Sequence, residues 1–576
     1  MTEILTAAQM RSIEQAAIES GEATGLALME RAGRGVVEAI FEEWPELAEG
    51  AVEEADEGGV APRPAASPQS ISVKKKRAVV LCGPGNNGGD GFVVARVLRE
   101  LGWGVEVFLY GEAERLPPDA RVNYERWCAL GGVAPFEDDQ FDGWPGGREG
   151  VCLIVDALLG TGLGRPFLEC RHMSIALNTA SSLAATRGVF PKVVAVDVPS
   201  GMCADSGVWL GEERPLDFAN LANLTVTFHA RKLGHLLADG PASCGTVRVV
   251  DIGLSSGQQA ASLSHTGGRA AYDERGLGRV ACREATGAGI RSLWTFGEHK
   301  YAHGHALILS GGAGRTGAAR LAARGALRIG AGLVTLGVPG AAQLEVATQV
   351  TAIMLQRAGT SEELAAVLED PRLNALCLGP GMGLRRARDL VPVALAGGRA
   401  TVLDADALTA FAGAPEALLD LTRGGQVVLT PHGGEFARLF PDIAAKLADG
   451  CSEGPAYSKV DATREAAARA GCVVLFKGAD TVIAAPDGRC SLNAAVYERA
   501  APWLATAGSG DVLAGFITGL LARGFEPMAA AEAGAWLHVE CARAFGPGLI
   551  AEDLPEILPE ILSRVLQAQA QQPEQR

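Results

Sequence analysis

Short apolar runs alternate with amphipathic helical stretches along most of this chain. In the first half, strands are predicted at residues 78–82, 105–110, 151–155, 192–197, 223–228 and 246–250. In the second half, they are predicted at residues 306–310, 333–338, 375–379, 400–403, 426–429, 472–476 and 480–484. Because helical or irregular segments separate these strands, the pattern predicts mostly parallel sheets with helices on both faces. Such sheets bind ligands beyond the carboxyl ends of their strands.

The pattern predicts two doubly wound, three-layer α/β domains. Residues 7–42 predict one or two helices before the first strand. Residues 45–70 are acidic and then rich in Pro, Gly and Ser, which predicts a disordered insert. Residues 255–296 change in character and lack clear periodicity at first, which is typical of a linker. We therefore expect three segments, namely a first domain at 1–253, a linker at 254–284 and a second domain at 285–566.

Composition narrows the possible functions. A chain of 576 residues has room for two or more domains. Its formal net charge of −16 argues against a surface that binds nucleic acid, but backbone N–H groups can still hold phosphorylated ligands. None of the twelve cysteines forms a C-x-x-C pair, which favours buried free thiols in a reducing cytoplasm. We find no signal peptide and no apolar run long enough to span a bilayer, so we expect no membrane partner.

One loop rich in glycine turns into a helix. Gly508 and Gly510 let the backbone turn tightly and approach a ligand. Apolar residues at helical spacing over 512–521 predict that the helix begins near Ser509, and its unpaired N–H groups form an anion site. Asp511 beside this site either accepts the proton of a hydroxyl that attacks a phosphoryl group, or is only a first-turn residue favoured by the helix dipole. These residues alone do not decide between the two.

Three oxygen-bearing side chains follow three predicted strands of the first half. They are the amide of Asn87, the carboxylate of Asp156 and the hydroxyl of Ser200. This set contains no thiol and no imidazole, which suits a hard cation. Asn, Asp and Ser are also common capping and turn residues, and on these residues alone that interpretation is favoured.

Two patterns that suggest cofactors lack the residues that would complete them. Residues 83–88, followed by a predicted helix over 92–101, match the dinucleotide pattern G-x-G-x-x-G, and so do residues 312–317. No acidic residue ends the next strand in either case, so we do not expect redox use. His299 and His303 lie near one another in the sequence, but a glycine interrupts the helical face and no Cys or carboxylate joins them, so we do not expect zinc.

The second half resembles the NAD(P)H-hydrate dehydratase branch of the ribokinase-like superfamily over most of residues 299–550. Six stretches carry the resemblance in order: Ser310-Gly311-Gly312 with Thr316-Gly317-Ala318-Ala319, Gly379-Pro380-Gly381-Met382-Gly383, Asp404-Ala405-Asp406-Ala407-Leu408, Thr430-Pro431-His432-Gly433-Gly434-Glu435, Lys477-Gly478-Ala479-Asp480-Thr481, and Gly508-Ser509-Gly510-Asp511. The chain departs from this family at Arg315, where a Tyr is usual.

The first half resembles the NAD(P)H-hydrate epimerase family over about residues 8–253. The matching stretches are Leu28-Met29-Glu30-Arg31-Ala32-Gly33, Gly85-Asn86-Asn87-Gly88-Gly89-Asp90-Gly91, Asp156-Ala157-Leu158-Leu159-Gly160-Thr161-Gly162, Asp197-Val198-Pro199-Ser200-Gly201, and Lys232-Leu233-Gly234. This resemblance implies a Rossmann-like first domain and favours the cation site over capping.

Together the resemblances imply a fused repair enzyme for hydrated NADH and NADPH. The first domain would interconvert the R and S hydrates, and the second would dehydrate the S-hydrate through phosphorylation by ADP or ATP with magnesium. We favour ADP, because bacterial members use it. The implied catalytic residues are Asp197 and Asp511, and the implied potassium ligands are Asn87, Asp156 and Ser200. The chain is expected to form a homo-oligomer.

The resemblance also assigns ligand contacts residue by residue. The nucleotide would contact Lys477, Gly478, Ala479, Asp480, Thr481, Gly508, Ser509 and Gly510. The hydrate would contact Asn86, Asn87, Gly88, Gly89, Asp90, Gly160, Thr161, Gly162, Leu163, Gly164, Arg165, Pro166 and Asp197 in the first half. In the second half it would contact Ala318, Gly381, Gly383, His432 and Asp511.

Two other functions remain open at this point. One is a small-molecule kinase that releases a stable phosphorylated alcohol, which the Thr430–Glu435 stretch argues against. The other is a non-catalytic nucleotide sensor or scaffold, which the presence of Asp197, Lys477 and Asp511 argues against.

Overall fold

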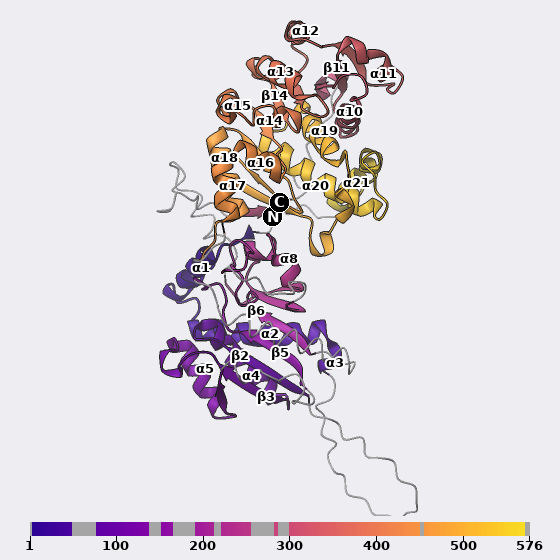
Figure 1. Ribbon diagram of the computed structural model, residues 1–576. Coiled ribbons are helices and arrows are strands. Elements are labelled where there is room, and N and C mark those ends of the chain that lie inside the picture. Colours follow the sequence, from indigo (N-terminus) through magenta and orange to yellow (C-terminus); the bar gives the residue numbers. More distant parts are fainter. Residues whose placement is uncertain are drawn as a thin grey trace, which may run out of the picture. The chain divides into compact units, whose positions relative to one another are not determined.

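The computed structural model describes residues 3–48, 76–136, 151–164, 191–211, 221–254, 282–285, 299–449 and 454–570. The chain forms two compact units, each described here by itself (Figure 1). The N-terminal unit comprises Leu5–Ser262 and Gly450–Ala456. The C-terminal unit comprises Met1–Ile4, Leu263–Asp449 and Tyr457–Arg576.

The N-terminal unit is built on a seven-stranded sheet, in which every pair of neighbouring strands is parallel. In spatial order its strands are β4 (Val133–Pro135), β3 (Gly104–Leu109), β2 (Arg77–Cys82), β5 (Val151–Ala157), β6 (Lys192–Val196), β7 (Leu224–Phe228) and β8 (Thr246–Val250). Its helices are α1 (Ala7–Glu19), α2 (Gly25–Glu43), α3 (Pro45–Ala48), α4 (Asn86–Glu100), α5 (Pro118–Cys128) and α8 (Gly240–Ser243). The strand order reverses beside β2, which is where doubly wound sheets bind ligands.

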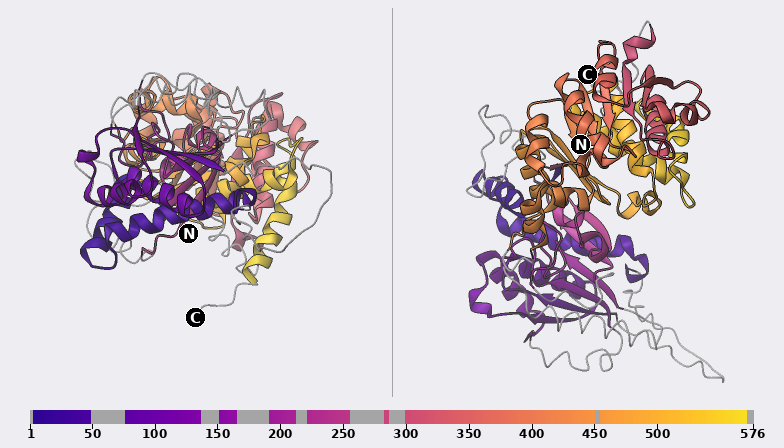
Figure 2. Two further views of the ribbon diagram at one scale, coloured as in Figure 1. Left: turned by 90° about the horizontal axis from the view of Figure 1, so that it is seen from below. Right: turned by 45° about the horizontal axis from the view of Figure 1, so that its top comes forward.

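Both faces of this sheet are apolar, as expected for a parallel sheet. On one face, Val80 and Val155 pack with side chains of α2, α4 and α5, which cover that face (Figures 1 and 2). On the other face, Val79, Leu81 and Ile154 form a separate cluster. The side chains of β2 therefore alternate between two buried layers, which is why its sequence is a continuous apolar run.

Helix α4 begins at Asn86, six residues before the predicted start at Phe92. The prediction was wrong because the glycines of this loop indicate a turn by sequence alone. In the structure they allow close packing of the helix. A Cβ at Gly88 would lie 2.0 Å from the carbonyl oxygen of Gly83, and one at Gly91 would lie 2.8 Å from the sulfur of Cys82. The asparagine loop is therefore the first turn of a helix.

The C-terminal unit is built on an eleven-stranded mixed sheet. In spatial order its strands are β1 (Glu3–Ile4), β9 (Cys282–Glu284), β18 (Cys490–Ala494), β17 (Asp480–Ala484), β16 (Val473–Phe476), β15 (Val427–Leu429), β14 (Ala400–Leu403), β13 (Ala375–Leu378), β10 (His305–Leu309), β11 (Leu333–Val338) and β12 (Met354–Arg357). In this spatial order, each neighbouring pair from β16 to β12 is parallel. Strand β17 is antiparallel to both of its neighbours, β16 and β18.

Helices cover both faces of this sheet (Figure 1). They are α10 (Gly317–Arg328), α11 (Gln343–Ala347), α12 (Ser361–Val367), α13 (Leu384–Ala396), α14 (Asp406–Thr409), α15 (Pro415–Thr422), α16 (Gly433–Leu439), α17 (Pro441–Ala448), α18 (Lys459–Ala470), α19 (Ser509–Ala522), α20 (Pro527–Phe545) and α21 (Asp553–Ala570). The predicted fold class, α/β with doubly wound, mostly parallel sheets, is confirmed.

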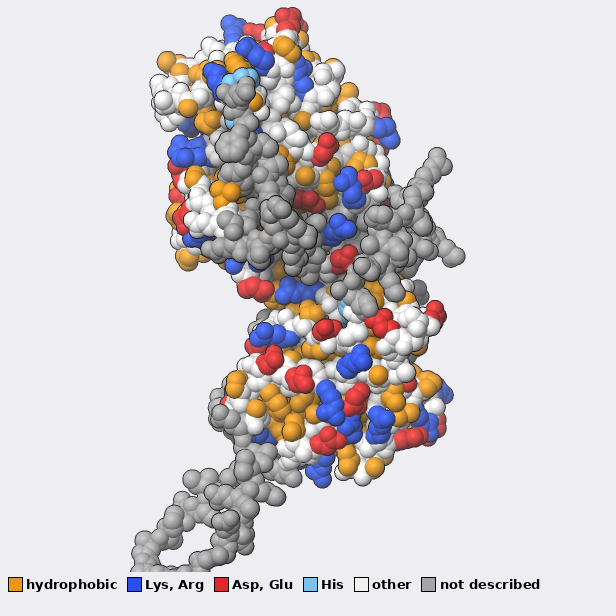
Figure 3. Space-filling model, turned by 180° about the vertical axis from the view of Figure 1, so that it is seen from behind, with side chains coloured by type: hydrophobic (Ala, Val, Ile, Leu, Met, Phe, Trp, Pro, Cys, Tyr) orange, Lys and Arg blue, Asp and Glu red, His pale blue; other side chains and the backbone are white. Residues whose placement is uncertain are grey.

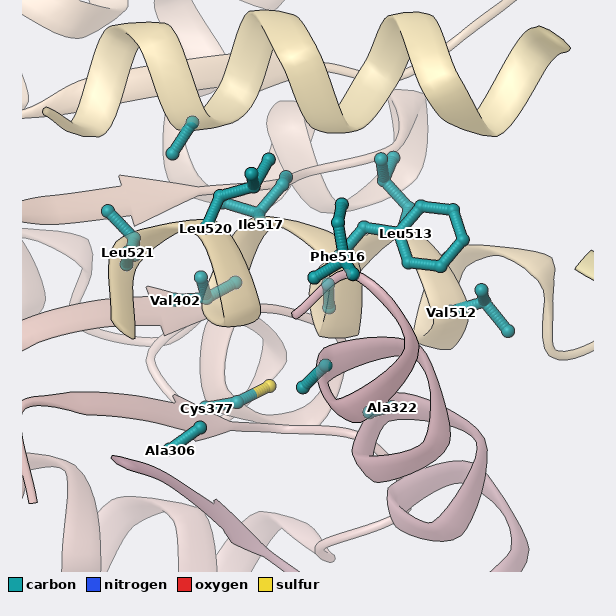
Figure 4. Packing of buried hydrophobic residues seen from close by; sticks show 14 of the residues in the cluster. Ala306, Ala322, Cys377, Val402, Val512, Leu513, Phe516, Ile517, Leu520 and Leu521 are labelled. Atoms are coloured by element: carbon teal, nitrogen blue, oxygen red, sulfur yellow. The ribbon is translucent and has the colours of Figure 1, made fainter. Parts of the chain in front are cut away.

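Helix α19 lies at the centre of the largest apolar cluster of this unit. Figure 4 shows Phe516 between α19 and α10, and Val402 and Cys377 on the strands beneath. Small residues let the helices approach closely, because a Cβ at Gly515 would lie 2.1 Å from the carbonyl oxygen of Ala322. This packing fixes the first turn of α19, where Asp511 lies.

The structure differs from the predicted domain borders at three places. Strand β1 pairs with β9, so both belong to the second sheet, although we had placed them in the first domain and the linker. The segment Gly450–Ala456 belongs to the N-terminal unit, where Ala456 packs beside Cys203. Strands of two or three residues carry no detectable period, so the sequence could not indicate them. Residues 49–70 of the predicted insert lie outside the described residues, and residues 45–48 form α3.

Surface charges of both signs are interspersed on the face shown in Figure 3. None of the described helices is long and apolar enough to cross a membrane.

Candidate active sites

In the N-terminal unit, four neighbouring strands bring polar residues to one edge of the sheet. Strand β2 leads to Asn86 and Asn87 at the start of α4, and β5 ends with Asp156. Strand β6 leads to Asp197 and Ser200. Because these strands are parallel neighbours, their carboxyl ends meet, and the predicted residues of this half converge there.

Asp156 and Ser200 are directly hydrogen-bonded to each other. The Ser200 hydroxyl donates to Asp156 Oδ1 at 2.6 Å, and the Ser200 backbone N–H donates to Asp156 Oδ2 at 2.9 Å. Both side chains are buried. Burial raises the pKa of the Asp156 carboxyl, and the hydrogen bonds from Ser200 oppose that rise only in part.

The Asn87 side chain lies against the loop that follows β5. A Cβ at Gly160 would meet Asn87 Oδ1 at 2.9 Å and Asp197 Oδ2 at 3.3 Å, so both oxygens flank this glycine. Asn87 Nδ2 is buried and has no hydrogen-bond partner. A buried amide atom without a partner is costly, which indicates that a ligand completes this part of the site.

The Asp197 carboxylate receives three donors. Its Oδ1 accepts the Thr227 hydroxyl at 2.9 Å and lies 3.0 Å from the Lys232 ammonium, and its Oδ2 accepts the Thr161 backbone N–H at 3.2 Å. Burial alone would raise the pKa of Asp197, but Lys232 and the hydrogen bonds outweigh it, and the pKa lies below its ordinary value. Its backbone is held at a φ of 68°, a strained conformation that often occurs at functional sites.

Lys232 and His235 support Asp197, and our sequence analysis gave them no role. Lys232 is 1% exposed, and its ammonium also donates to the Phe228 carbonyl at 3.0 Å. His235 Nδ1 accepts the Lys232 backbone N–H, so its Nε2–H donates to the Asp197 carbonyl at 2.8 Å. Burial, and then the charge of Lys232, lowers the pKa of His235 to about 4, so the ring is neutral at pH 7. The signal that the sequence offered for these two roles was a Lys shortly before a His.

The remaining predicted contacts of this half lie on the same loops. Gly88, Gly89 and Asp90 are buried in α4, and the Leu163 backbone N–H donates to the Gly160 carbonyl at 3.2 Å. Arg165 and Pro166 lie outside the described residues.

In the C-terminal unit, α19 begins at Ser509 as predicted. Gly508 has a φ of 90°, and a Cβ there would lie 2.7 Å from Leu321 Cδ1 and 2.9 Å from Ala551 Cβ. The Ser509 hydroxyl donates to the Leu504 carbonyl at 2.8 Å, and His538 Nε2 lies 2.8 Å from the Ser509 carbonyl oxygen. These contacts fix the turn that leads into Asp511. The supporting His538 was not predicted.

Lys477 lies beside this turn, at the end of β16. Its ammonium donates to Asp404 Oδ1 at 2.7 Å, and a Cβ at Gly510 would lie 3.6 Å from it. Glu435 Oε2 is 3.9 Å away. Asp404 and Glu435 lie in two of the stretches that carry the resemblance of the second half, but we assigned no role to either from the sequence.

Asp511 is a half-buried carboxyl near other carboxylates. Burial, and then the negative charges of Asp404 and Asp406, raises its pKa to about 6, and Lys477 opposes this rise. Such a group is ionised at pH 7 and can accept a proton as a general base.

The predicted nucleotide contacts that follow β16 form a tight loop. The Thr481 hydroxyl donates to the Gly478 carbonyl at 2.7 Å, and the Gly478 N–H points back to the same hydroxyl at 3.2 Å. Lys459 donates to Asp480 Oδ1 at 2.6 Å. This loop continues directly from Lys477, so the contacts predicted there lie together.

The predicted hydrate contacts of the second half lie on three elements. A Cβ at Gly381 would lie 3.4 Å from Ala318 Cβ, so these two residues are adjacent. The Gly383 N–H donates to Asp406 Oδ2 at 2.8 Å, beside the carboxylates that surround Asp511. His432 is the N-cap residue of α16, and its backbone N–H donates a hydrogen bond to the Glu435 carboxylate.

The loop before α10 has a partner that we did not predict. Glu345 accepts the Gly314 backbone N–H at 2.7 Å and the Thr316 hydroxyl. The Arg315 side chain between them is exposed.

Comparisons with known proteins identify the family of each half of the chain. Residues 306–564 match the family described as NAD(P)H-hydrate dehydratase, and residues 25–234 match the family described as YjeF-related protein N-terminus. The bifunctional NAD(P)H-hydrate repair enzyme of Moorella thermoacetica is 35% identical over 547 residues, which cover 93% of this chain and 91% of that protein. The chain belongs to the family of bifunctional NAD(P)H-hydrate repair enzymes.

Relatives of each half are also found. The NAD(P)H-hydrate epimerase of Rhodobacter capsulatus is 44% identical over 248 residues, which cover 42% of this chain and 95% of that protein. A crystal structure of the Bacillus subtilis ADP/ATP-dependent NAD(P)H-hydrate dehydratase with ATP and Mg²⁺ is 29% identical, covers 49% of this chain and 98% of its own, and has a TM-score of 0.40. The expected repair function, with epimerase and dehydratase activities, is confirmed, and the small-molecule kinase is not supported.

Proposed function

We propose that each activity of this repair enzyme depends on one aspartate, the buried Asp197 for epimerisation and the half-buried Asp511 for dehydration. The observation that supports this most strongly is the setting of Asp511. It combines a helix N-terminus, a lysine and a carboxyl whose pKa is near 6. A phosphoryl-transfer site needs these three components, namely donors for developing charge, a cation and a general base.

In the dehydratase site, the hydroxyl of the S-hydrate is a poor leaving group. Asp511 accepts its proton while the hydroxyl oxygen attacks the terminal phosphoryl group of the nucleotide. The N–H groups of residues 508–510 stabilise the charge that develops. The phosphate group then leaves with the C–O electron pair while the ring nitrogen lone pair forms a C=N⁺ bond. Loss of a proton to water from the adjacent ring carbon then forms the C=C bond of the reduced ring, and the C=N electrons return to nitrogen.

We propose ADP as the nucleotide and magnesium as its companion ion. Among the described residues, no group of three or more His, Cys, Asp or Glu side chains is placed to hold a metal. This fits magnesium, which protein sites often hold through phosphate oxygens, waters and one or two carboxylates. Asp404 and Glu435 are the carboxylates nearest to Lys477. Magnesium would screen the phosphate charge.

We propose potassium at Asn87, Asp156 and Ser200 in the epimerase site. The donor set is an amide, a carboxylate and a hydroxyl, which suits a hard monovalent ion. The partnerless Asn87 amide nitrogen supports this, because a 180° rotation of the amide would place its oxygen there, and the two orientations are a matter of assignment. The ion would hold the three side chains around the hydrate pocket.

The hydrates of NADH and NADPH are the proposed substrates, and the cytoplasm is the proposed location. The described cysteines are all free and most are buried, which suits a reducing compartment. We also propose a homo-oligomer, with no nucleic-acid or membrane partner.

Incubation of the S-hydrate with the enzyme and ADP tests the dehydratase proposal. We expect the absorbance of the reduced nicotinamide ring and free phosphate to rise together. A stable phosphorylated hydrate, with no return of the ring absorbance, would instead identify a kinase. The same incubation with ATP measures the nucleotide preference.

A further inference from the structure

A second buried aspartate lies in the epimerase site, and the proposed mechanism does not use it. Asp90 is in α4, three residues after Asn87, so the two side chains share one face of the helix. Asp90 is 9% exposed, and no hydrogen bond from a described residue reaches its carboxyl group. Asn87 Oδ1 and Asp197 Oδ2 flank the same glycine, so this face of α4 is directed toward Asp197.

The two aspartates have opposite surroundings. Asp197 has the Lys232 ammonium at 3.0 Å and two further donors, which stabilise the ionised form. Asp90 has none of these, and an unpaired charge is strongly disfavoured in a buried position. Two carboxyl groups whose surroundings separate their ionisation are the usual basis for an acid and a base in one site.

We propose that Asp90 is a second catalytic residue of the epimerase site and acts as its general acid, paired with Asp197 as the general base. This inference rests on the proposed function of that site. From the sequence, Asp90 is predicted only as a residue that contacts the hydrate.

The chemistry of the hydrate requires both roles. The C–O bond breaks with its electron pair on oxygen, which takes a proton from Asp90 and leaves as water. The ring nitrogen lone pair forms a C=N⁺ bond. A water molecule adds to the opposite face, its extra proton passes to Asp197, and the C=N electrons return to nitrogen. Atoms and charge balance, and proton exchange with water restores both carboxyls.

The charges around Asp90 support this assignment. Burial raises the pKa of Asp90 well above its ordinary value, and the negative charges of Asp197 and Glu14 raise it further. The Cys82 thiol on β2 also lies close, and burial raises its pKa, so it adds no charge near neutral pH. These surroundings favour the protonated form that a general acid needs.

Glu14 is the competing candidate for the same role. It lies on α1 one turn after Arg11, whose guanidinium donates to the Thr161 carbonyl at 3.1 Å beside Asp197. Burial, and then Asp197, raises the pKa of Glu14, while Lys232 and Arg11 lower it. Since Glu14 is only partly buried and has cations nearby, Asp90 is the better proton donor.

The test compares Asp90→Asn with Glu14→Gln in the full-length enzyme. We measure conversion of R-hydrate to S-hydrate by chromatography without nucleotide, with the uncatalysed rate subtracted. For Asp90→Asn we expect kcat to fall by ~10²–10⁴, as is typical for loss of a general acid, with little change in KM. The decrease of the rate at high pH should also disappear, because an amide has no proton to lose.

Two controls separate chemistry from folding. Asp251→Asn changes an exposed aspartate of the same unit and should leave the rate unchanged. Should Asp90→Asn fail to fold, Asp90→Ser removes the carboxyl with less bulk, and added formic acid should restore part of its activity.

Three results would overturn the inference. They are an Asp90→Asn kcat within threefold of the parent, a raised KM with unchanged kcat, and a larger loss in Glu14→Gln than in Asp90→Asn. Absence of epimerisation in the parent enzyme would instead contradict the proposed function. Retention of the original hydroxyl oxygen during epimerisation in ¹⁸O-labelled water would exclude the C–O cleavage proposed here.

Discussion

The two sites of this chain each contain an aspartate and a nearby lysine, yet the aspartates differ in ionisation. In the N-terminal unit, Lys232 contacts Asp197 directly at 3.0 Å, and the pKa of Asp197 is lowered. In the C-terminal unit, the lysine at 477 binds Asp404 at 2.7 Å, and Asp511 has a pKa near 6.

This difference shows that the partner of the lysine decides the role of the aspartate. A lysine that pairs with the catalytic carboxyl stabilises its charge. A lysine that pairs with another carboxylate leaves the catalytic one among like charges, which favour its protonated form. Asp511 therefore binds a proton at a pH close to neutral, whereas Asp197 has a lower affinity for a proton.

The largest expected effect separates the two activities. Asp511→Asn should lower ADP-dependent dehydration by ~10²–10⁴, because an amide cannot accept the proton, while epimerisation is retained. Asp197→Asn should do the reverse, so that R-hydrate persists while S-hydrate is consumed. The measurement is the consumption of each epimer, resolved by chromatography with and without ADP. Near-normal turnover of Asp511→Asn would show that α19 is not the phosphoryl-transfer site.

Removal of Lys232 should destabilise the N-terminal unit. Lys232→Met leaves Asp197 buried without its cation, and breaking a buried pair in this way typically costs about 3–5 kcal/mol. Hydrogen exchange of the β5 and β6 amides reports on this unit alone. The matched control is Arg248→Met, which removes a half-exposed arginine of the same unit paired with Glu43 and should cost under about 1 kcal/mol. Equal effects of the two variants would contradict the role given to Lys232.

A methyl group at the turn before α19 should cost less than a lost buried charge. In Gly508→Ala, the new alanine must adopt a positive φ, and its methyl group would lie very close to Leu321 and Ala551. We expect about 1–3 kcal/mol of local destabilisation and a reduced kcat for dehydration alone. Gly424→Ala is the matched control, because its φ is 73° but the surrounding space is open. If both variants lose dehydration equally, the position of the turn is not what matters.

The smallest predicted effect is on pH dependence. A base with a raised pKa loses its activity as the pH falls through that value. Dehydration should therefore fall about tenfold per unit below pH 6, because Asp511 becomes protonated. Epimerisation should persist to lower pH, since the pKa of Asp197 is lowered. Rates of both activities between pH 4.5 and 8 test this, and a common acid limb would contradict the comparison.

Much of the fold followed from the sequence, but its edges did not. The strands predicted at 333–338, 400–403 and 480–484 agree with β11, β14 and β17. Strand β12 was not predicted, because it lies at the sheet edge with exposed residues and has no continuous apolar run. The two-residue strand β1 is too short for any periodic signal. In α4, packing of glycines against other segments extends the helix beyond what propensity predicts.

The sequence by itself determined the order of strands and helices. It also determined the position of Asp197 just after an apolar run and of Asp511 just before one. This was possible because periodicity and motif spacing are local properties of the chain. Only the tertiary structure decided that Lys232 pairs with Asp197 and that Lys477 pairs with Asp404 rather than Asp511. It also decided that Asp90 is buried with no hydrogen-bond partner among the described residues. Lys477 and Asp404 are 73 residues apart, and the ionisation of a buried group depends on all charges that folding brings around it.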